Sequence, residues 1–441
     1  MPMTSLSRAC ALLSIVAFLS AAAPPVFAWQ GAAPSEADPS EAAPVGGSTD
    51  EQKHVLGVEI DFPGGSGEVE SLDQQHRVVR LRPTPHKDRG WECWWYIKLS
   101  GVRPGETITI DVGDAPWATP DRAMFSLDNQ HWRHTEPGSR DGKRIVYRQQ
   151  IDGATAWFAW GPPFVPADSR KLVDWAARQC EHATVFELCR TRDDRPVPAL
   201  RINTPTEDAK EGDDGEKGAP RYGVWIQARQ HAWEAGSSWV CRGLVEWIVS
   251  DDPRAVALRD EAEITIIPIM DIDSVAIGAG GKNQVPQDHN RDWSDKPHWN
   301  AVAAAIKQIA ERNEAGRFDL FIDLHNPGAG NRNPFFFVTP RELLSDQGRR
   351  NLDRFLAAAR QDITGPLSFV GETRESGVSY DRLWRNISKN WVSFHCHEHV
   401  VSVTLETAWN TPNSTTDGYL TVGRQLGLAI ERYLRTRPRE Q

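Results

Sequence analysis

Two patterns of apolar and polar positions divide the chain. From His54 to about Phe164, short alternating runs such as "VVRLR" and "ETITIDVG" are separated by Gly, Pro, Asp and Asn. Alternation of this kind is typical of strands that bury one face, and frequent turn residues between such runs are typical of a β-sandwich. The pattern therefore predicts an antiparallel β-sandwich domain over residues 54–165.

A different pattern begins near Arg170. Amphipathic stretches such as "HWNAVAAAIKQIAERNEAG" alternate with strongly apolar runs, "EITIIPIMD", "FDLFIDLH" and "VVSVTLETAW". Helices that alternate with apolar strands are typical of α/β domains whose strands are buried on both faces. We therefore predict an α/β domain over residues 166–441, with a mixed, mostly parallel sheet flanked by helices.

The N-terminal segment has the features of an export signal. In residues 1–28, Arg8 precedes the apolar stretch "ACALLSIVAFLSAAA", and "VFA" ends at Ala28 as a small-residue cleavage site. Residues 29–53 are rich in Ala, Pro, Ser and Glu, so we expect a disordered spacer. We predict a secreted or periplasmic protein with no stable membrane association beyond the signal, because no later apolar segment is long enough to span a bilayer.

Composition supports two globular domains and excludes one class of partner. The 441 residues are 39% hydrophobic and 25% charged, and a chain of this length is too long for one compact core. The formal net charge is −10 and there is no basic stripe, so we expect no nucleic-acid partner. Part of the acidity lies in "TEDAKEGDDGEKGAP", residues 206–220, which is typical of a solvated surface loop. The sequence indicates no oligomeric state.

The cysteines give little structural guidance. One of the six, Cys10, lies in the export signal, and the odd number that remains leaves at least one without an intramolecular partner. Cys180 and Cys189 are near enough in sequence to form a disulfide in an oxidising compartment. The absence of a Cys-x-x-Cys pair argues against a zinc ribbon.

Three strand-like runs lead into ionisable side chains. His231 follows "RYGVWIQAR", His325 ends "FDLFIDLH" and Glu406 ends "VVSVTLE". Functional side chains of open α/β sheets gather beyond the carboxyl ends of the strands, so we expect these three to lie close together. Glu234 follows His231 at a spacing that places both side chains on one side of a helical turn.

His231, Glu234 and His325 are the candidate metal ligands. Two imidazoles and one carboxylate form a ligand set for catalytic zinc and leave a fourth position open. We therefore predict one Zn²⁺ ion per chain. Such an ion lowers the pKa of a bound water from about 16 toward 7. Taken singly, each residue fits a capped loop or a hydrogen-bonded strand end, but together they indicate a metal site.

The sequence around these residues resembles the zinc metallocarboxypeptidases. The stretch "MDIDSVAIGAGGKNQVPQDHNRDW" contains a strand exit, a Gly-rich loop and an Asn-Arg pair, and "DLH" and "TLETAW" follow in the order of that family. Within the family, the chain is most similar to the cytosolic carboxypeptidase-like branch, which carries a β-sandwich before its catalytic domain. The resemblance covers about residues 54–436 and implies a zinc-dependent carboxypeptidase.

The resemblance assigns roles to individual residues. It implies that the three ligands bind zinc, that Glu406 is the general base, and that Asn290 and Arg291 hold the C-terminal carboxylate of a peptide or protein substrate. A planar guanidinium suits a carboxylate because it binds both oxygens. The arginine that the family usually has nine residues before the asparagine falls on Gly281 here. The adjacent Lys282 is the candidate for polarising the scissile carbonyl.

The substrate side chain is the least constrained part of the interpretation. The family's late tyrosine has one candidate, Tyr380. The resemblance implies that the substrate pocket is lined by the loop between residues 373 and 390. Three arginines in this loop, Arg374, Arg382 and Arg385, would favour acidic C-termini, although surface arginines explain them equally well.

Two other functions fit parts of the sequence. An amidase with the same metal ligands would deacylate N-acyl amino acids or trim cell-wall peptides, and it would not require a free C-terminal carboxylate. A non-catalytic protein that binds glycan or protein is the second alternative. Gly281 in place of arginine favours it, as do the tryptophans of "GWECWWYIK" and "TAWFAWGPPF". Aromatic residues in short alternating strands, however, are more often core.

Two local motifs have alternative interpretations. Arg291 would pair with Asp288 or Asp292 if it belonged to a surface network. The stretch "FHCHEH", residues 394–399, would place its three histidines on one face of a strand, where a second metal is geometrically feasible. The other interpretation of this stretch is a polar strand beside the cleft.

Overall fold

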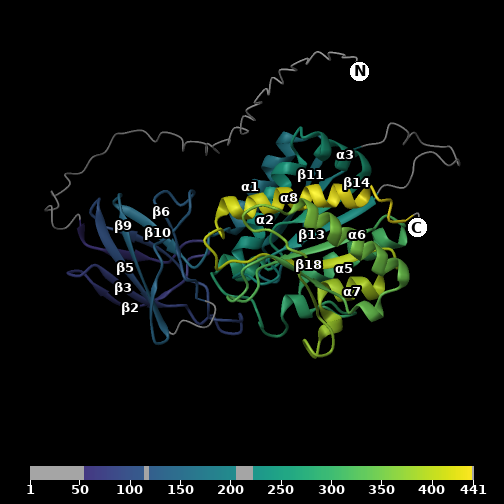
Figure 1. Ribbon diagram of the computed structural model, residues 1–441. Helices are drawn as coiled ribbons and strands as arrows, with labels where there is room; N and C mark the ends of the chain where they lie inside the picture. The colour runs from purple at the N-terminus through teal and green to yellow at the C-terminus, as the bar shows by residue number, and fades with distance from the viewer. Residues whose placement is uncertain (1–53, 114–118, 205–221, 440–441) are drawn as a thin grey trace, which may run out of the picture. The chain divides into compact units, whose positions relative to one another are not determined.

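The computed structural model describes residues 54–113, 119–204 and 222–439 (Figure 1). The predicted export signal and spacer, and the acidic stretch at residues 206–220, lie outside the described residues. From Thr49 to Gln441 the chain forms one compact unit, which contains both predicted domains.

The first domain is the predicted β-sandwich. Its two five-stranded sheets have the orders β1-β4-β10-β6-β7 and β2-β3-β5-β9-β8. The strand pairs are antiparallel except for β3 with β5, and buried positions alternate along β5 as the sequence pattern predicted. The strands are β1 (Gly57–Glu59), β2 (Glu68–Asp73), β3 (Val78–Arg82), β4 (Tyr96–Ser100), β5 (Glu106–Val112), β6 (Met124–Ser126), β7 (Arg133–His134), β8 (Ser139–Asp141), β9 (Arg144–Ile151) and β10 (Thr155–Ala159).

The tryptophans that raised the binding-module alternative lie mostly inside this domain. Trp94, Trp95 and Trp160 are buried in its apolar core. The ring of Trp95 packs against that of Tyr147, with the ring centres 6.1 Å apart. Burial of each such ring stabilises the fold by about 2–3 kcal/mol, so these side chains act as core and not as a surface for stacking sugars.

The second domain contains the predicted mixed sheet. Its eight strands have the order β11-β12-β14-β13-β15-β18-β16-β17, and the central run β14-β13-β15-β18 is parallel. These central strands are buried on both faces, which accounts for their continuous apolar sequences. The strands are β11 (Ala183–Arg190), β12 (Pro196–Ile202), β13 (Tyr222–Ala228), β14 (Ala262–Ile267), β15 (Leu320–His325), β16 (Phe335–Val338), β17 (Thr373–Glu375) and β18 (Val401–Glu406).

Helices flank this sheet (Figure 1). Helices α2 and α8 pack tightly against each other, and α7 packs against β15 and β18. The α-helices are α1 (Pro166–Gln179), α2 (Ala235–Ile248), α3 (Pro253–Glu261), α4 (Ile272–Ala276), α5 (Asn300–Glu314), α6 (Asp346–Asp362), α7 (Ser388–His395) and α8 (Thr416–Leu434). Short 3-10 helices are η2 (His289–Arg291), η3 (Arg341–Leu343) and η4 (Trp384–Asn386).

The strand order locates the functional edge of the sheet. After β13 the chain goes to β14 on one side, and it returns to β15 on the other side. Such a reversal leaves a crevice at the carboxyl ends of the strands, which is where α/β proteins bind ligands. His231 follows β13 and His325 ends β15, so both histidines lie at this reversal.

Neither a disulfide nor a membrane helix contributes to the described part of the fold. Cys180 and Cys189, which the sequence places near enough to bridge, are both free thiols. None of the helices within the described ranges combines the length and the apolarity that a membrane crossing requires.

Candidate active site and metal centre

The turn after β13 carries the first two candidate ligands. The backbone N–H of Glu234 donates to the carbonyl of His231 at 3.2 Å, so both side chains belong to one turn. Glu234 is the N-cap residue of α2, but its side chain makes no capping bond. Its two carboxylate oxygens lie instead 2.8 Å from Nδ1 of His231 and 2.7 Å from Nδ1 of His325. The turn therefore directs the carboxylate to the imidazoles and not to the helix.

These three side chains form a candidate metal site. One ligand atom from each lies within 4.8 Å of the others, and all three side chains are buried. Within the described part of the chain, no other group of His, Cys, Asp and Glu side chains meets this criterion. Two imidazole nitrogens and a carboxylate that converge in this way fit a zinc ion with three protein ligands.

A second carboxylate lies behind each imidazole. Asp288 Oδ1 is 3.1 Å from Nε2 of His231, and Asp323 Oδ2 is 2.9 Å from Nε2 of His325. Such a contact fixes the tautomer that presents Nδ1 to a metal, and it raises the basicity of the ring. Ser388 Oγ donates to Asp323 at 2.6 Å, which holds this carboxylate in place. Neither aspartate was predicted to have this function. The contact of Asp288 with His231 arises only from the fold, whereas Asp323 lies two positions before His325 on the same strand.

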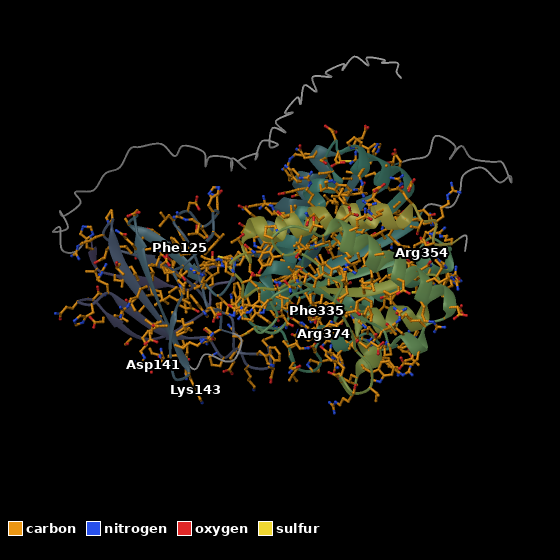
Figure 2. The ribbon with its side chains drawn as sticks, in the orientation of Figure 1. Phe125, Asp141, Lys143, Phe335, Arg354 and Arg374 are labelled. Atoms are coloured by element: carbon orange, nitrogen blue, oxygen red, sulfur yellow. The ribbon has the colours of Figure 1, made fainter. Side chains whose placement is uncertain are left out.

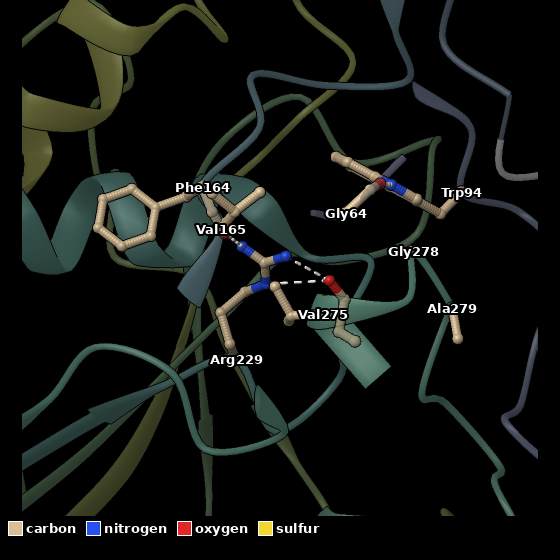
Figure 3. A pocket seen from close by; sticks show the side chains of 9 residues that line it. Gly64, Trp94, Phe164, Val165, Arg229, Val275, Gly278 and Ala279 are labelled. Atoms are coloured by element: carbon tan, nitrogen blue, oxygen red, sulfur yellow. Dashed lines mark hydrogen bonds between the residues drawn. The ribbon is translucent and has the colours of Figure 1, made fainter. Parts of the chain in front are cut away.

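Arg229 supports the turn from His231 to Glu234, which we call the ligand turn. Figure 3 shows the guanidinium group of Arg229, with dashed lines for its hydrogen bonds. Its backbone has φ +62°, an uncommon value for a residue other than glycine, and its guanidinium is buried. Nε and Nη2 both donate to the carbonyl of Ala232, and Nη1 donates to the carbonyl of Phe164 at 3.3 Å. Burial lowers the pKa of Arg229 to about 9. This residue lies two positions before the first residue of the His-x-x-Glu motif, yet its function in the turn could not be predicted from the sequence.

Glu406 lies beside the candidate metal site. It ends β18 directly opposite His325 of β15 in the parallel register. The side chain is buried, and Oε2 has no hydrogen-bond partner among the described residues. Burial raises the pKa of Glu406 to about 8, against the opposing effect of His325. A carboxyl group that exchanges its proton near neutral pH has the property that a general base requires.

Lys282 also faces the site. Its Nζ lies 3.2 Å from Oδ2 of Asp288, and its charge acts on the carboxyl group of Glu406. The adjacent Gly281 has φ +79°, and a Cβ there would lie 2.6 Å from the backbone nitrogen of Ala232. The position where the family usually has arginine therefore has no room for a side chain, and the nearest cation is Lys282.

Arg291 is buried and close to the candidate tyrosine. Its Nε donates to Asp381 Oδ2 at 2.8 Å, and its guanidinium carbon lies 5.7 Å from the ring centre of Tyr380. The surface network with Asp288 or Asp292 is therefore wrong, because the ion pair of Arg291 is with Asp381 and the side chain is only 7% exposed.

Asn290 contacts the metal site itself. Its Nδ2 lies 3.3 Å from Nε2 of His325, and its Oδ1 accepts a hydrogen bond from the backbone N–H of Ser388 at 3.0 Å. The fold thus places Asn290 between a candidate ligand and the start of α7. Its role toward a substrate carboxylate stays a prediction.

Lys389 is a buried cation that the sequence analysis missed. Its Nζ donates to Ser376 Oγ at 2.7 Å and to Asn390 Oδ1 at 2.6 Å, both neutral groups. No ion pair to Lys389 occurs among the described residues. Burial, with a further contribution from Arg291, holds the pKa of Lys389 well below its usual value. On β18, Thr404 lies on the same face as Glu406, and its buried hydroxyl has no partner in the described chain.

The three arginines proposed for acidic C-termini are at the surface. Arg374 stacks on Phe335, with 3.9 Å from guanidinium carbon to ring centre (Figure 2), and it pairs with Glu372 at 2.6 Å. Arg382 and Arg385 are exposed. Lys389, which belongs to the same stretch of sequence, is the cation that lies inside the protein.

The stretch "FHCHEH" does not form the strand that we predicted. His395 is the last residue of α7, and its ring stacks on Trp391 of the preceding turn at 4.6 Å between ring centres. His399 instead lies 3.3 Å from Asp319. The histidines therefore do not share one face of a strand, because the helix continues to the start of the motif.

Comparison with known families decides the class of protein. The profile of the zinc carboxypeptidase family matches residues 170–427, more than half of the chain. The chain belongs to the zinc carboxypeptidase family. The profile of the cytosolic carboxypeptidase N-terminal domain matches residues 58–160 of this zinc carboxypeptidase. The predicted resemblance and the assignment as a metallocarboxypeptidase hydrolase are both confirmed.

Individual relatives agree with the family. The uncharacterised protein ZMO1242 of Zymomonas mobilis is 25% identical to this zinc carboxypeptidase over 283 residues, 62% of this chain and 68% of that protein. Human cytosolic carboxypeptidase 6 is 28% identical over 295 residues, 59% of this chain but only 55% of the human protein. The crystal structure of a metallo-carboxypeptidase from Burkholderia cenocepacia shares the fold, with a TM-score of 0.73 and 24% identity over 87% of this chain and 99% of that chain.

Proposed function

We propose that this zinc carboxypeptidase removes single residues from the C-terminus of peptides or proteins, with one zinc ion bound by His231, Glu234 and His325. The observation that carries the proposal is the position of Glu406. A buried carboxyl group lies opposite a candidate metal ligand and has an oxygen without a partner among the described residues. A hydrolytic metal site requires such a base beside its open position.

The side chains of the site supply the remaining parts of the reaction. A bound zinc ion supplies a Lewis acid and lowers the pKa of water. Glu406 takes a proton from the attacking water and returns it to the leaving amine. Lys282 stabilises the negative charge that develops on the carbonyl oxygen, and Arg291 binds the terminal carboxylate of the substrate.

We further propose that the enzyme prefers an acidic C-terminal side chain. Lys389 supports this preference, because its amino group is buried and contacts only neutral partners, Ser376 and Asn390. A buried cation without a counter-ion is unfavourable, and a substrate carboxylate would supply the missing charge. The buried hydroxyl of Thr404 offers that carboxylate a hydrogen bond.

The direct test compares two forms of one peptide. The zinc-loaded enzyme should release glutamate from a peptide with a free C-terminus and should not act on the same peptide with an amidated C-terminus. Cleavage of both forms at similar rates would favour the amidase alternative. Absence of cleavage with zinc bound would favour a non-catalytic binding protein.

The preference is tested with Lys389→Met. This variant should lower kcat/KM for a C-terminal glutamate by about tenfold or more relative to a C-terminal leucine, because a hydrogen bond to a charged group is lost. Arg382→Met, at an exposed position of the same loop, is the matched control and should leave this ratio unchanged.

We also propose that the enzyme acts outside the cytoplasm. The support is the sequence of residues 1–28 alone, which lies outside the described residues. Mass spectrometry of the protein from its native source should find a mature chain that begins after Ala28. A chain that retains these residues in the cytoplasm would refute the proposal.

A further inference from the structure

We propose that residues 88–91 of the first domain position the catalytic centre, because they hold the loop that carries Lys282 against the ligand turn. The inference rests on the proposed function in one respect, since it takes Lys282 to act on the scissile carbonyl. We call residues 88–91 the positioning segment and residues 280–285 the lysine loop. In this proposal the β-sandwich affects the reaction because it holds Lys282 in position, and it does not bind a second ligand.

Three backbone hydrogen bonds join the positioning segment to the lysine loop. They run from Val285 N to Asp88 O at 2.9 Å, from Gly281 N to Arg89 O at 2.8 Å, and from Trp91 N to Lys282 O at 2.9 Å. The third bond is to the peptide group of Lys282 itself. Bonds on both sides of one lysine fix the direction in which its side chain leaves the backbone.

The contact is too close for any side chain at its centre. Gly90 has φ +86°, and a Cβ at this position would lie 2.3 Å from the carbonyl oxygen of Lys282. The three nearest neighbours of that Cβ are all backbone atoms, which cannot rotate away. Arg89 adds an ion pair from the same segment to Asp193 of the second domain, at 3.0 Å. The positioning segment therefore packs closely against the lysine loop and is also paired with the second domain.

The lysine loop in turn contacts the ligand turn. The backbone N–H of Trp233, which lies between His231 and Glu234, donates to the carbonyl of Gly280 at 3.0 Å. The ring of Trp233 is buried in the apolar core of the first domain, with its centre 5.0 Å from that of Trp160. The lysine loop is thus bonded on one side to the first domain and on the other side to the residues that present the metal ligands.

A glycine pair gives the decisive test. Gly90→Ala adds a methyl group that must push the lysine loop away, whereas Gly142→Ala adds one at φ +59° with no atom within 4 Å. Both substitutions carry similar backbone strain in the same domain, and only the first reaches the catalytic domain. The measurements are kcat and KM on a C-terminally free peptide, zinc content, and hydrogen exchange of residues 280–285 by mass spectrometry.

We expect Gly90→Ala to lower kcat by about tenfold to hundredfold, because small displacements of a catalytic group have effects of this size. KM and zinc content should stay close to wild type, since Lys282 is proposed to act only in the transition state. Hydrogen exchange of the lysine loop should become faster than in Gly142→Ala. Equal kcat or equal exchange in the two variants would overturn the proposal.

Two safeguards keep the test decisive. If Gly90→Ala does not fold, Arg89→Ala removes only the ion pair to Asp193 and should lower kcat and speed exchange in the same direction to a smaller extent. Unchanged values in a folded Arg89→Ala would then refute the proposal. If wild-type protein cleaves no peptide, the proposed function fails, but the exchange measurement still decides whether the positioning segment holds the lysine loop.

Discussion

Two buried glutamates at the site differ because of their neighbours. Burial favours the neutral form of both side chains. At Glu234, His231 and His325 outweigh burial and lower the pKa to about 2. At Glu406, burial prevails and raises the pKa to about 8. Environments that move the pKa values of two carboxyl groups apart in this way suit them to different functions, here those of a candidate charged ligand and a candidate general base.

The first prediction concerns Glu406. Glu406→Gln should lower kcat by about 10²–10⁴-fold, because the amide cannot accept the proton of the attacking water. Zinc content should remain that of the wild type, since Glu406 is not among the three ligands. Glu398→Gln, an exposed glutamate near the same strand, serves as control. Near-native turnover by the Glu406 variant would remove this residue from the reaction.

The second prediction concerns Lys389 and pH. The unfolded chain protonates this lysine below its usual pKa of 10.5, whereas the folded protein holds the pKa well below that value. Between this lowered pKa and 10.5, the unfolded chain binds a proton that the folded protein lacks, so the contribution of Lys389 to stability rises with pH across that window. Lys389→Met removes this linkage, so it should stabilise the protein most at pH 7 and progressively less at higher pH.

Denaturant unfolding between pH 7 and pH 10 measures this difference. Lys307→Met replaces a lysine that is 77% exposed and should show no such trend. A stability difference between Lys389→Met and wild type that does not change with pH would show that the lysine is charged in both states.

At the residue scale, the sequence indicates the candidate metal ligands better than the residues that hold them in place. His231, Glu234, His325 and Glu406 follow strand-like runs, and a sheet brings the ends of its strands together whatever the details. Asp323, Arg229 and Lys389 were missed, because their functions depend on side-chain packing that the residue types do not indicate. Asp323 and Arg229 act on neighbours in the same segment, His325 and Ala232. Lys389 acts through its burial beside Ser376. Nothing in the local sequence of Lys389 separates it from the exposed Arg382 and Arg385, and only burial does so.

At the scale of elements, the ligand turn depends on how α2 is held. Helix α2 starts at the turn, and its close packing on α8 fixes the helix. A Cβ at Gly423 of α8 would lie 2.0 Å from the carbonyl of Val240 and 2.6 Å from the amide nitrogen of Leu244 in α2. The two helix backbones therefore approach as closely as glycine allows, which gives the turn a rigid base.

The third prediction tests this helix contact. Gly423→Ala should lower the free energy of unfolding by about 1–3 kcal/mol, because the added methyl group overpacks a backbone contact. The adjacent Arg424→Ala is at an exposed position and should change the free energy by no more than about 0.5 kcal/mol. Thermal and denaturant unfolding measure both. Equal stability of the two variants would contradict the close packing.

Strands with a clear alternating or continuous apolar pattern were predicted correctly, whereas one polar stretch was not. The alternating strands of the sandwich and the apolar strands of the α/β sheet appear where the sequence placed them. The prediction of a strand at residues 394–399 was wrong. Alternating histidines have the period of a strand, but residues "SKNWVSFH" form helix α7, which ends inside this stretch. The stacking of His395 on Trp391, one turn earlier in the same helix, supports the helical conformation there.

At the scale of the whole molecule, both domains contact the turn that carries two candidate metal ligands. Trp233 lies between two candidate metal ligands of the second domain and is buried in the core of the first. The sequence predicted both domains, but it could not show this contact, since it depends on how the surfaces of two separately patterned segments meet. We therefore expect the β-sandwich to be a structural part of the enzyme and not an accessory module.

The fourth prediction tests most directly whether one zinc ion is bound by His231, Glu234 and His325, which lie at the ends of two strands. The measurement is zinc bound per chain after equilibrium dialysis, for wild type beside His325→Ala and the exposed control His397→Ala. The account predicts one zinc ion in wild type and in the control, and none retained by His325→Ala. A wild-type chain without zinc, or a His325→Ala chain that still holds it, would contradict the assigned metal site.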